Sequence, residues 1–325
     1  MFNPILSTNM DQLKTFLSAL FLFCAVGASA QSTVYFTKDI SPEGLLNIYK
    51  ALGVEATGRV AVKISTGEAG GNNYLKPDLI RNLVDHVNGT IVECNTAYPG
   101  RRMKSEDHWQ VIHEHGFDSI FAVDIMDEYG DLRIPIRDKK HMKYNIVGDH
   151  LGNYDFMINL AHFKGHAMGG FGGVLKNQSI GVASSAGKAY IHSAGKLQSP
   201  AELWENLPAQ DFFLESMAAA AQSVHDWFDG RILYINVMNN MSVDCDCDSH
   251  PEDPKMKDVG ILASTDPVAL DKACLDLVFN HKASEGDDNQ PLIERINRQH
   301  GTYIVDYAEQ IGLGSKQYVL KSIDK

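Results

Sequence analysis

Short runs of β-branched and other apolar residues alternate with helix-like segments through the first half of the chain. The strand-like runs are Thr33–Thr37 (TVYFT), Arg59–Ser65 (RVAVKIS), Thr90–Asn95 (TIVECN) and Ser119–Met126 (SIFAVDIM). Helix signals lie between them, such as Ser41-Pro42, where a capping serine precedes a proline at the first helical position. Parallel strands need a crossover of this length, usually a helix. The alternation therefore predicts an α/β fold with a mainly parallel sheet and crossover helices.

The second half of the chain has a less regular pattern. Leu132–Asp138 and Lys143–Gly152 resemble short, antiparallel strands. We expect strands at Tyr154–His166 and Arg231–Val243, a long helical region over Ser199–Phe228, a strand, turn and helix over Asp258–His281, and a helical tail over Pro291–Gly314. No Pro/Ser-rich linker separates these segments, so residues 31–325 are expected to form one α/β domain, undivided or as two closely joined lobes.

The N-terminal segment has the pattern of a signal peptide. An apolar run, Phe16–Val26, is too short to span a bilayer comfortably, and Ala28–Ala30 fits the small-x-small pattern of a signal-peptidase site. We expect residues 1–30 to be a cleaved signal peptide, and the mature chain to be secreted, in a bacterial periplasm. A lipid anchor on Cys24 is the alternative, which the bulky residue before it does not favour. No second apolar run of transmembrane length follows.

Acidic residues outnumber basic ones, with 41 Asp and Glu against 29 Lys and Arg and a formal net charge of −12. This charge argues against nucleic acid and anionic membrane surfaces as partners. It leaves room for a small anionic ligand or substrate, because a local basic site can lie within an acidic surface. The oligomeric state is not indicated.

One stretch, Ala161–Gly181 (AHFKGHAMGGFGGVLKNQSIG), carries no acidic residue at all. Lys164, His166 and Lys176 supply positive charge and hydrogen-bond donors within it. Four glycines would let backbone N–H groups approach a ligand closely: Gly169, Gly170, Gly172 and Gly173. We expect a loop that binds a carboxylate or phosphate. The alternative is a flexible surface loop or tight packing against a neighbouring strand.

The catalytic candidates are His166, Lys176 and His192. His166 suits a general base or a metal ligand, with a structural histidine as the alternative, and His162 ranks behind His192. Lys176 would pair with a substrate anion or act as a desolvated amine nucleophile, unless it is an ordinary surface lysine. Asn177 would orient the ligand or cap a turn.

A second segment, Val243–His250 (VDCDCDSH), combines thiols, carboxylates and an imidazole within a few positions. Its candidate metal ligands are Cys245, Cys247 and His250. Such donors suit Zn or Fe, and a further ligand would come from His166 or His192. The alternatives are a redox pair, since an oxidising compartment permits disulfides, or an acidic turn with inert cysteines.

Two further groups of polar residues are candidates for the functional site. The glycine-asparagine loop after the second strand-like run offers Asn72 and Asn73 as ligand-binding residues. Later in the chain come Asp258, Asp266 and Asp271. Helix capping explains Asp266, which precedes a proline, whereas Asp271 would face the site or form a salt bridge.

Two blocks of the sequence resemble the domain of unknown function 362 family. They are KGHAMGGFGGVLKNQSIG, residues 164–181, and DCDCDSHPEDPKMKDVGILASTDPVALDKA, residues 244–273. The resemblance implies an α/β fold and covers most of the chain after the signal peptide. Many members carry an iron–sulfur ferredoxin insert with several C-x-x-C runs. This sequence has no C-x-x-C, so a ferredoxin-type 4Fe–4S cluster is not expected.

A more distant similarity is to the nickel-pincer lactate racemase family. In that family a histidine, a lysine and a second histidine follow one another at intervals of ten and sixteen residues, as acid/base, cofactor-anchoring lysine and nickel ligand. His166, Lys176 and His192 have the same intervals, which adds nickel to the metals considered. The segment CNTAYPGRR, residues 94–102, stands where the family's first catalytic histidine is expected.

These features predict an exported protein with one ligand cleft, with His166 and Lys176 on one wall and the two cysteines nearby. We expect a metal-dependent or redox enzyme acting on a small anionic molecule, without a readable reaction type. The alternative from another class is a non-catalytic periplasmic protein that binds a metal, an iron–sulfur group or another cofactor. In a third interpretation both motifs only maintain the fold.

Overall fold

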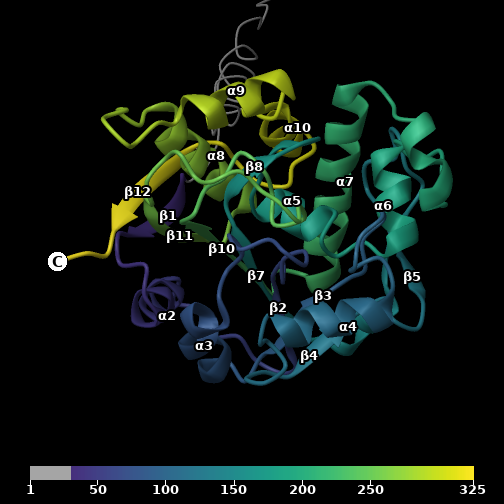
Figure 1. Ribbon diagram of the computed structural model, residues 1–325, viewed down its shortest axis with the longest axis horizontal. Coiled ribbons are helices and arrows are strands. Elements are labelled where there is room, and N and C mark those ends of the chain that lie inside the picture. The colour runs from purple at the N-terminus through teal and green to yellow at the C-terminus, as the bar shows by residue number, and fades with distance from the viewer. Residues whose placement is uncertain (1–30) are drawn as a thin grey trace, which may run out of the picture. The chain divides into compact units, whose positions relative to one another are not determined.

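An eight-stranded sheet organises the residues that the computed structural model describes, 31–325 (Figure 1). The strand order is β12-β1-β11-β10-β7-β2-β3-β4. The strands are β1 (Ser32–Thr37), β2 (Val60–Lys63), β3 (Thr90–Glu93), β4 (Val123–Ile125), β7 (Phe156–His162), β10 (Ile232–Met238), β11 (Gly260–Ser264) and β12 (Tyr318–Ser322). Strand β11 runs antiparallel to β1 and β10, and the other neighbouring pairs are parallel. The predicted fold class is therefore confirmed, while the predicted signal peptide lies outside the described residues.

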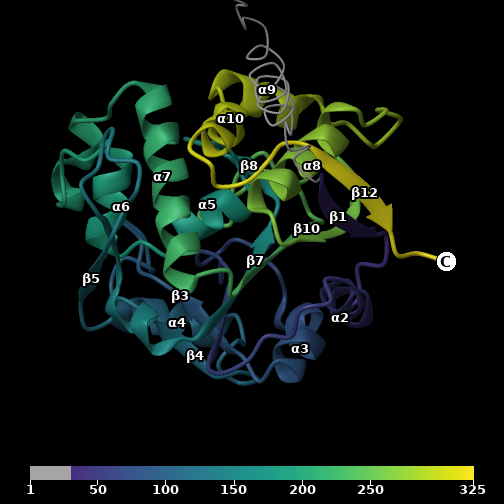
Figure 2. The same ribbon diagram turned by 180° about the vertical axis from the view of Figure 1, so that it is seen from behind.

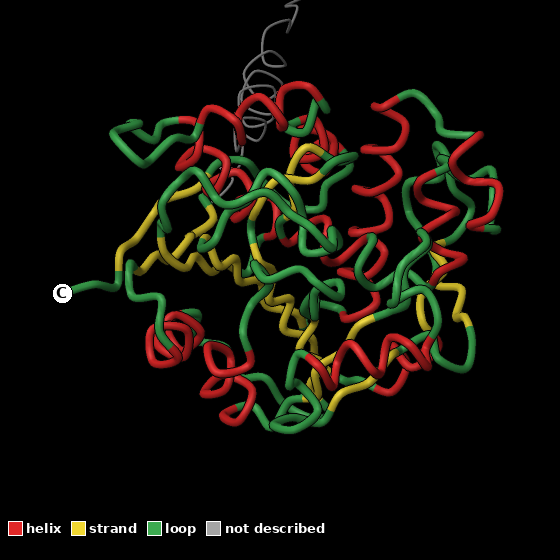
Figure 3. The backbone as a smooth tube through the Cα atoms, in the orientation of Figure 1, coloured by secondary structure: helices red, strands yellow, loops and turns green. Residues whose placement is uncertain are grey.

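Helices cover both faces of this sheet (Figures 1 and 3). They are α2 (Pro42–Ala51), α3 (Pro77–His86), α4 (Ser105–Glu114), α5 (Val174–Ser179), α6 (Ser185–His192), α7 (Gln210–Phe228), α8 (Pro267–Phe279), α9 (Gln290–Arg298) and α10 (Tyr303–Gln310). Val60 and Val62 of β2 pack in the same core cluster as residues of α2 and α3, whereas Ala61 packs in the cluster of α5, α7 and α8. Side chains of one strand thus alternate between two cores.

The contacts within Ser32–Lys325 form one compact unit. Among the helices of residues 31–325, none has the length and apolar character needed to cross a membrane.

Two expectations for secondary structure were incomplete. The helical region expected over Ser199–Phe228 is a 3₁₀ helix, η2 (Pro200–Glu205), followed by α7, and Pro208 lies in the break because proline disfavours helical continuation. Strand β12 was not expected, since it lies parallel to β1 at the sheet edge with mostly exposed side chains and so has no apolar alternation (Figure 2). The short antiparallel pair was expected and is formed by β5 (Asp131–Ile134) and β6 (Asn145–Gly148).

The glycine-rich stretch is not the open loop that the sequence predicted. It folds into the antiparallel strands β8 (Lys164–His166) and β9 (Gly170–Gly172) and the short helix α5, nearly all of it buried. A Cβ at Gly173 would lie 2.3 Å from the Asp271 carboxylate, so this glycine admits a protein carboxylate. A Cβ at Gly170, whose φ is +81°, would lie 2.8 Å from Gly301. The tight-packing alternative describes these glycines better.

Asp271 of α8 holds the beginning of α5 in place. Its two carboxylate oxygens accept hydrogen bonds from the backbone N–H groups of Val174 and Leu175, each at 2.9 Å, and Oδ1 also accepts one from Asn236 Nδ2 at 2.7 Å. Burial raises the pKa of Asp271 to about 6 against the opposing effect of these donors. The anion that the backbone N–H groups after Gly173 bind is therefore the Asp271 carboxylate of the protein itself.

Candidate functional site

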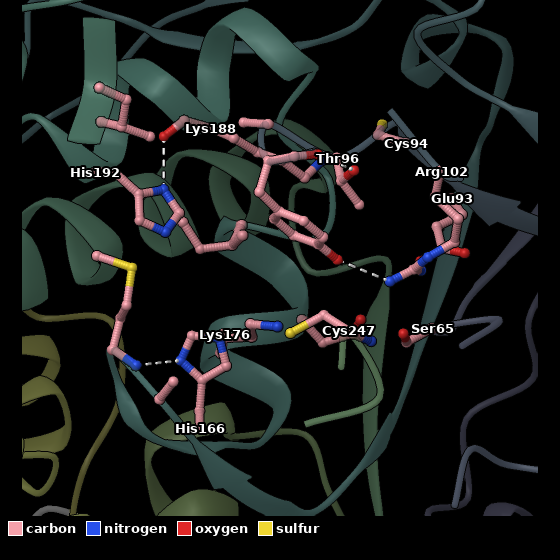
Figure 4. A pocket seen from close by; sticks show the side chains of 18 of the residues that line it. Ser65, Glu93, Cys94, Thr96, Arg102, His166, Lys176, Lys188, His192 and Cys247 are labelled. Carbon is pink, nitrogen blue, oxygen red and sulfur yellow. Dashed lines mark hydrogen bonds and ion pairs between the residues drawn. The ribbon is translucent and has the colours of Figure 1, made fainter. Parts of the chain in front are cut away.

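A pocket of about 280 Å³ lies at the carboxyl ends of the central strands (Figure 4). Lys63 ends β2 and Glu93 ends β3, and both line the pocket. His166 and Lys176, on the chain that follows β7, line it as well, together with Cys247. Carboxyl ends of parallel strands meet at one edge of a sheet, which is where open α/β sheets bind ligands. The topology therefore brings both sequence blocks to one pocket.

Helix α6 forms a further wall with Lys188 and His192. Ser184 begins this helix by accepting a hydrogen bond from the N–H of Gly187. The helix is short and almost wholly buried, so the side chains of Lys188 and His192 line the pocket instead of facing the solvent. Figure 4 shows Lys188 and His192 on one side of the pocket, with Arg102 and Glu93 on the opposite side.

Three lysines that line the pocket have no carboxylate partner among residues 31–325. Lys63 Nζ lies 3.2 Å from Asn177 Oδ1, and Lys188 Nζ donates to the Ala183 carbonyl at 2.5 Å. Lys176 Nζ has no hydrogen-bond partner among residues 31–325. By contrast, Arg102 pairs with Glu93 at 2.8 Å and with a second buried carboxylate. Unpaired charge in a buried pocket is unfavourable, so an incoming anion would stabilise it.

Burial also changes the protonation of two of these lysines. It lowers the pKa of Lys176 to about 7, with the nearby Lys164 adding to the effect. It lowers the pKa of Lys63 to about 8, against the attraction of Glu93. Both side chains thus change charge close to neutral pH, which ordinary surface lysines do not.

The two pocket histidines have complementary tautomers. His166 Nδ1 accepts the N–H of Gly169 at 2.8 Å, so a neutral His166 carries its proton on Nε2. His192 Nδ1 lies 2.7 Å from the Lys188 carbonyl and must donate to it, so its Nε2 has a free lone pair. Burial lowers the pKa of His166 well below its usual value and that of His192 to about 4. At neutral pH both rings are therefore uncharged.

The cysteine segment completes the site. A ring nitrogen of His166 and the sulfurs of Cys245 and Cys247 lie within 4.8 Å of one another, close enough to hold a metal ion together. Donors of a tetrahedral zinc site with bonds of about 2.0–2.3 Å are about 3.3–3.8 Å apart, so modest adjustment would suffice. The two sulfurs are joined as a disulfide in this structure. Because thiolates are the metal ligands, the donor set fits a soft metal only in its reduced form.

The family comparison covers both sequence blocks. The family model described as Domain of unknown function (DUF362) matches residues 60–276. The chain belongs to this family. Both blocks that carry the resemblance lie inside the match, and contacts between them, such as those of Asp271 with α5, build the pocket wall of this DUF362 protein.

Two solved structures are similar to this DUF362 chain at low identity. The lactate racemase apoprotein from Thermoanaerobacterium thermosaccharolyticum has 15% identity and a TM-score of 0.43, over 76% of this chain and 57% of that one. A protein from Thermotoga maritima has 11% identity and a TM-score of 0.40, over 83% of this chain and 58% of that one. The chain thus spans less than two thirds of either structure. No curated protein matches the sequence.

The positive charge of Lys164 is not available to a ligand in this DUF362 protein. Its Nζ lies 2.6 Å from Asp246 Oδ2, and His162 Nδ1 lies 2.8 Å from the other oxygen of the same carboxylate. Both partners hold the pKa of Asp246 well below its usual value despite its burial. Asp246 of the cysteine segment thus supplies a carboxylate to a stretch that has none of its own. This corrects the expectation that Lys164 supplies positive charge to a ligand.

Several other candidates lie away from the pocket. His250 is exposed and contacts Ser249, so the imidazole of the possible metal group comes from His166, one of the two sources considered from the sequence. Asn72 is exposed and accepts from Lys76, and Asn73 contacts the Glu252 carbonyl. The four candidate glycines, Gly169, Gly170, Gly172 and Gly173, are not part of the pocket lining.

Asn177 does line the pocket, where it fixes a lysine. Its amide nitrogen donates to the Lys63 carbonyl at 2.9 Å and to Asn159 Oδ1 at 2.8 Å, while its oxygen accepts from Lys63 Nζ. Asn177 thus positions Lys63. The sequence reasoning missed Lys63, although a lysine at the end of the buried run VAVK was the available signal.

Proposed function

We propose that this protein is an exported, metal-dependent enzyme that acts on a small anionic molecule bound in the pocket. The observation that carries this proposal is the convergence of Lys63, Lys176 and Lys188 beside Cys247, without carboxylate partners in the part of the chain that the structure describes. Lysine side chains at buried, uncompensated positions favour an anion such as a carboxylate or phosphate. In this proposal the lysines bind and orient the substrate, and His192 Nε2 accepts a proton from it.

The proposed metal would be held by Cys245, Cys247 and His166. Two thiolates and an imidazole suit Zn, Fe or Ni, and a fourth position would stay open to substrate. A metal bound there would polarise a substrate oxygen as a Lewis acid. Because neutral His166 carries its proton on Nε2, a metal on that nitrogen would require the proton to move to Nδ1, which would end the hydrogen bond that Nδ1 accepts from the Gly169 N–H.

The disulfide favours a second candidate function, a thiol–disulfide oxidoreductase. A dithiol substrate would reduce the Cys245–Cys247 bond to two thiols and leave as a disulfide, with Cys247 as the sulfur that lines the pocket. The two candidate functions differ in the role of disulfide reduction. In the metal-dependent enzyme, reduction creates the metal site. In the oxidoreductase, reduction is one half of the catalysed reaction.

Binding of sulfate tests the anion site directly, because the charge of sulfate is constant around neutral pH. We expect sulfate to raise the melting temperature in a concentration-dependent way. Lys176→Gln should weaken sulfate binding about 10-fold to 100-fold, because one charge-assisted hydrogen bond is lost. Calorimetry measures the affinity, and Lys282→Gln, which changes an exposed lysine outside the pocket, is the matched control.

The proposal would be wrong if sulfate and short carboxylates left the protein unaffected, or if Lys176→Gln bound them as the wild type does. A non-catalytic metal carrier predicts that second result together with intact, reversible metal binding. The anion measurement therefore separates the enzyme from the carrier.

Export rests on the sequence pattern of residues 1–30. If the pattern is read by a signal peptidase, protein recovered from the periplasm of an expressing bacterium should begin at Gln31 on N-terminal sequencing. An uncleaved chain beginning at Met1, recovered from the cytoplasm, would contradict export.

A further inference from the structure

The pocket has an apolar side as well as a basic one. Its lining includes Ala97, Ala167, Met168, Ile180, Leu203 and Trp204. A bare inorganic anion would contact the lysines and leave these side chains without a partner. Ligand sites that are mostly apolar with a few convergent polar groups suit organic molecules, whose body is buried and whose polar end is fixed.

Trp204 is the residue that makes this apolar side unusual. It lies on η2, which packs against α6, the helix of Lys188 and His192. Its neighbour Leu203 is 1% exposed and anchors the segment, whereas Trp204 is 48% exposed although it lines the pocket. A large aromatic side chain that is half in water at a pocket wall has apolar surface left to cover.

Met168 is a second apolar residue of the pocket lining. Its backbone N–H approaches His166 Nδ1 at 3.3 Å, so its side chain belongs to the segment that fixes the tautomer of His166. Methionine is flexible and makes favourable contacts with aromatic rings. A ring that contacts Met168 or Trp204 would lie in the same pocket as the histidines and lysines.

We infer that the ligand is an amphipathic organic anion, whose carboxylate or phosphate meets the lysines and whose apolar or aromatic body packs against Trp204 and Met168. This inference rests on the proposed function, because it assumes that the pocket binds an anion. Beyond the anionic group of the ligand, it specifies that the rest of the ligand is apolar or aromatic. A volume of about 280 Å³ admits a single small ring with a short acidic side chain.

The test compares acetate, butyrate and phenylacetate, which share one head group and differ in apolar body. Each methylene that becomes buried should raise the affinity about fourfold, and the phenyl ring should raise it more than tenfold over acetate. Affinities are measured by calorimetry, and intrinsic tryptophan emission should change with phenylacetate. Methyl phosphate and phenyl phosphate form a second pair that reports whether the head group is a phosphate.

Trp204→Ala should remove the gain from the phenyl ring and leave acetate binding unchanged. Trp227→Ala is the matched control, because Trp227 is 38% exposed and lines a different hollow beside Arg137 and Asp226. Trp204 is exposed, so its removal should leave the melting temperature close to that of the wild type, which is checked in parallel.

Equal affinities for acetate and phenylacetate would overturn this inference while leaving the anion site standing. The same holds if Trp204→Ala retains the full gain. Failure of every carboxylate, phosphate and sulfate to bind would overturn the proposed function and this inference together.

Discussion

Reduction of the Cys245–Cys247 disulfide is expected to change a chain that takes up no zinc into one that keeps about one equivalent through dialysis. The physical reason is that thiolates bind metal, whereas the sulfurs of a disulfide carry no charge and are poor ligands. In the reduced state two thiolates and the His166 imidazole would be brought together. Elemental analysis of protein incubated with zinc, with and without a phosphine reductant, measures the change.

Matched variants make this expectation specific. His166→Ala and Cys247→Ser should each lose most of the bound zinc. His250→Ala should keep it, because His250 is exposed and outside the group. Cys94→Ser should also keep it, since Cys94 is a free, buried cysteine whose thiol donates to the Val182 carbonyl. Equal zinc in the oxidised and reduced proteins, or none in either, would refute the metal site.

The fold could be predicted because buried strands and helices have characteristic patterns of apolar residues in the sequence. Runs such as RVAVKIS are apolar on both faces of the sheet, and capping signals such as Ser41-Pro42 mark where helices begin. Strand β12 has no such pattern, because its side chains at the sheet edge are mostly exposed and only its backbone pairing with β1 makes it a strand. The glycine-rich stretch was misread because glycine permits both loops and close packing.

The site could be predicted only in part from the sequence, because the charge and burial of several of its residues depend on contacts with residues far away in the chain. His166, Lys176 and the cysteines were conspicuous as polar residues in unusual local patterns. Nothing near Lys164 in the sequence reveals that Asp246 neutralises it, since the two are 82 positions apart. Nor does helix α6 distinguish Lys188 from a surface lysine, because only tertiary packing buries the helix.

Sulfate binding should weaken steeply as the pH rises from about 6 to about 9. Lys176 and Lys63 have pKa values of about 7 and about 8 in the folded protein, so both are cationic below this range and neutral above it. The bound anion stabilises only the cationic forms. We therefore expect an affinity loss of about tenfold or more for each lysine that deprotonates, with the first loss centred near neutral pH.

The lowered pKa values of Lys63 and Lys176 have the opposite effect on the free energy of unfolding, which should rise with pH where sulfate affinity falls. Between about pH 7 and pH 10 the unfolded chain holds protons on these lysines that the folded chain has released, so the free energy of unfolding of the ligand-free protein should rise with pH there. Sulfate reverses part of this trend because it favours the protonated, folded form. Denaturant titrations with and without sulfate should therefore converge as the pH rises.

Lys176→Arg separates the two lysines, because a guanidinium stays charged throughout this range. The variant should lose the step near pH 7 and keep the step that belongs to Lys63. A sulfate affinity that does not change between pH 6 and pH 9 in the wild type would show that these lysines do not hold the anion. A step near pH 7 that persists in Lys176→Arg would assign it to another group, and would remove Lys176 from the centre of the anion site.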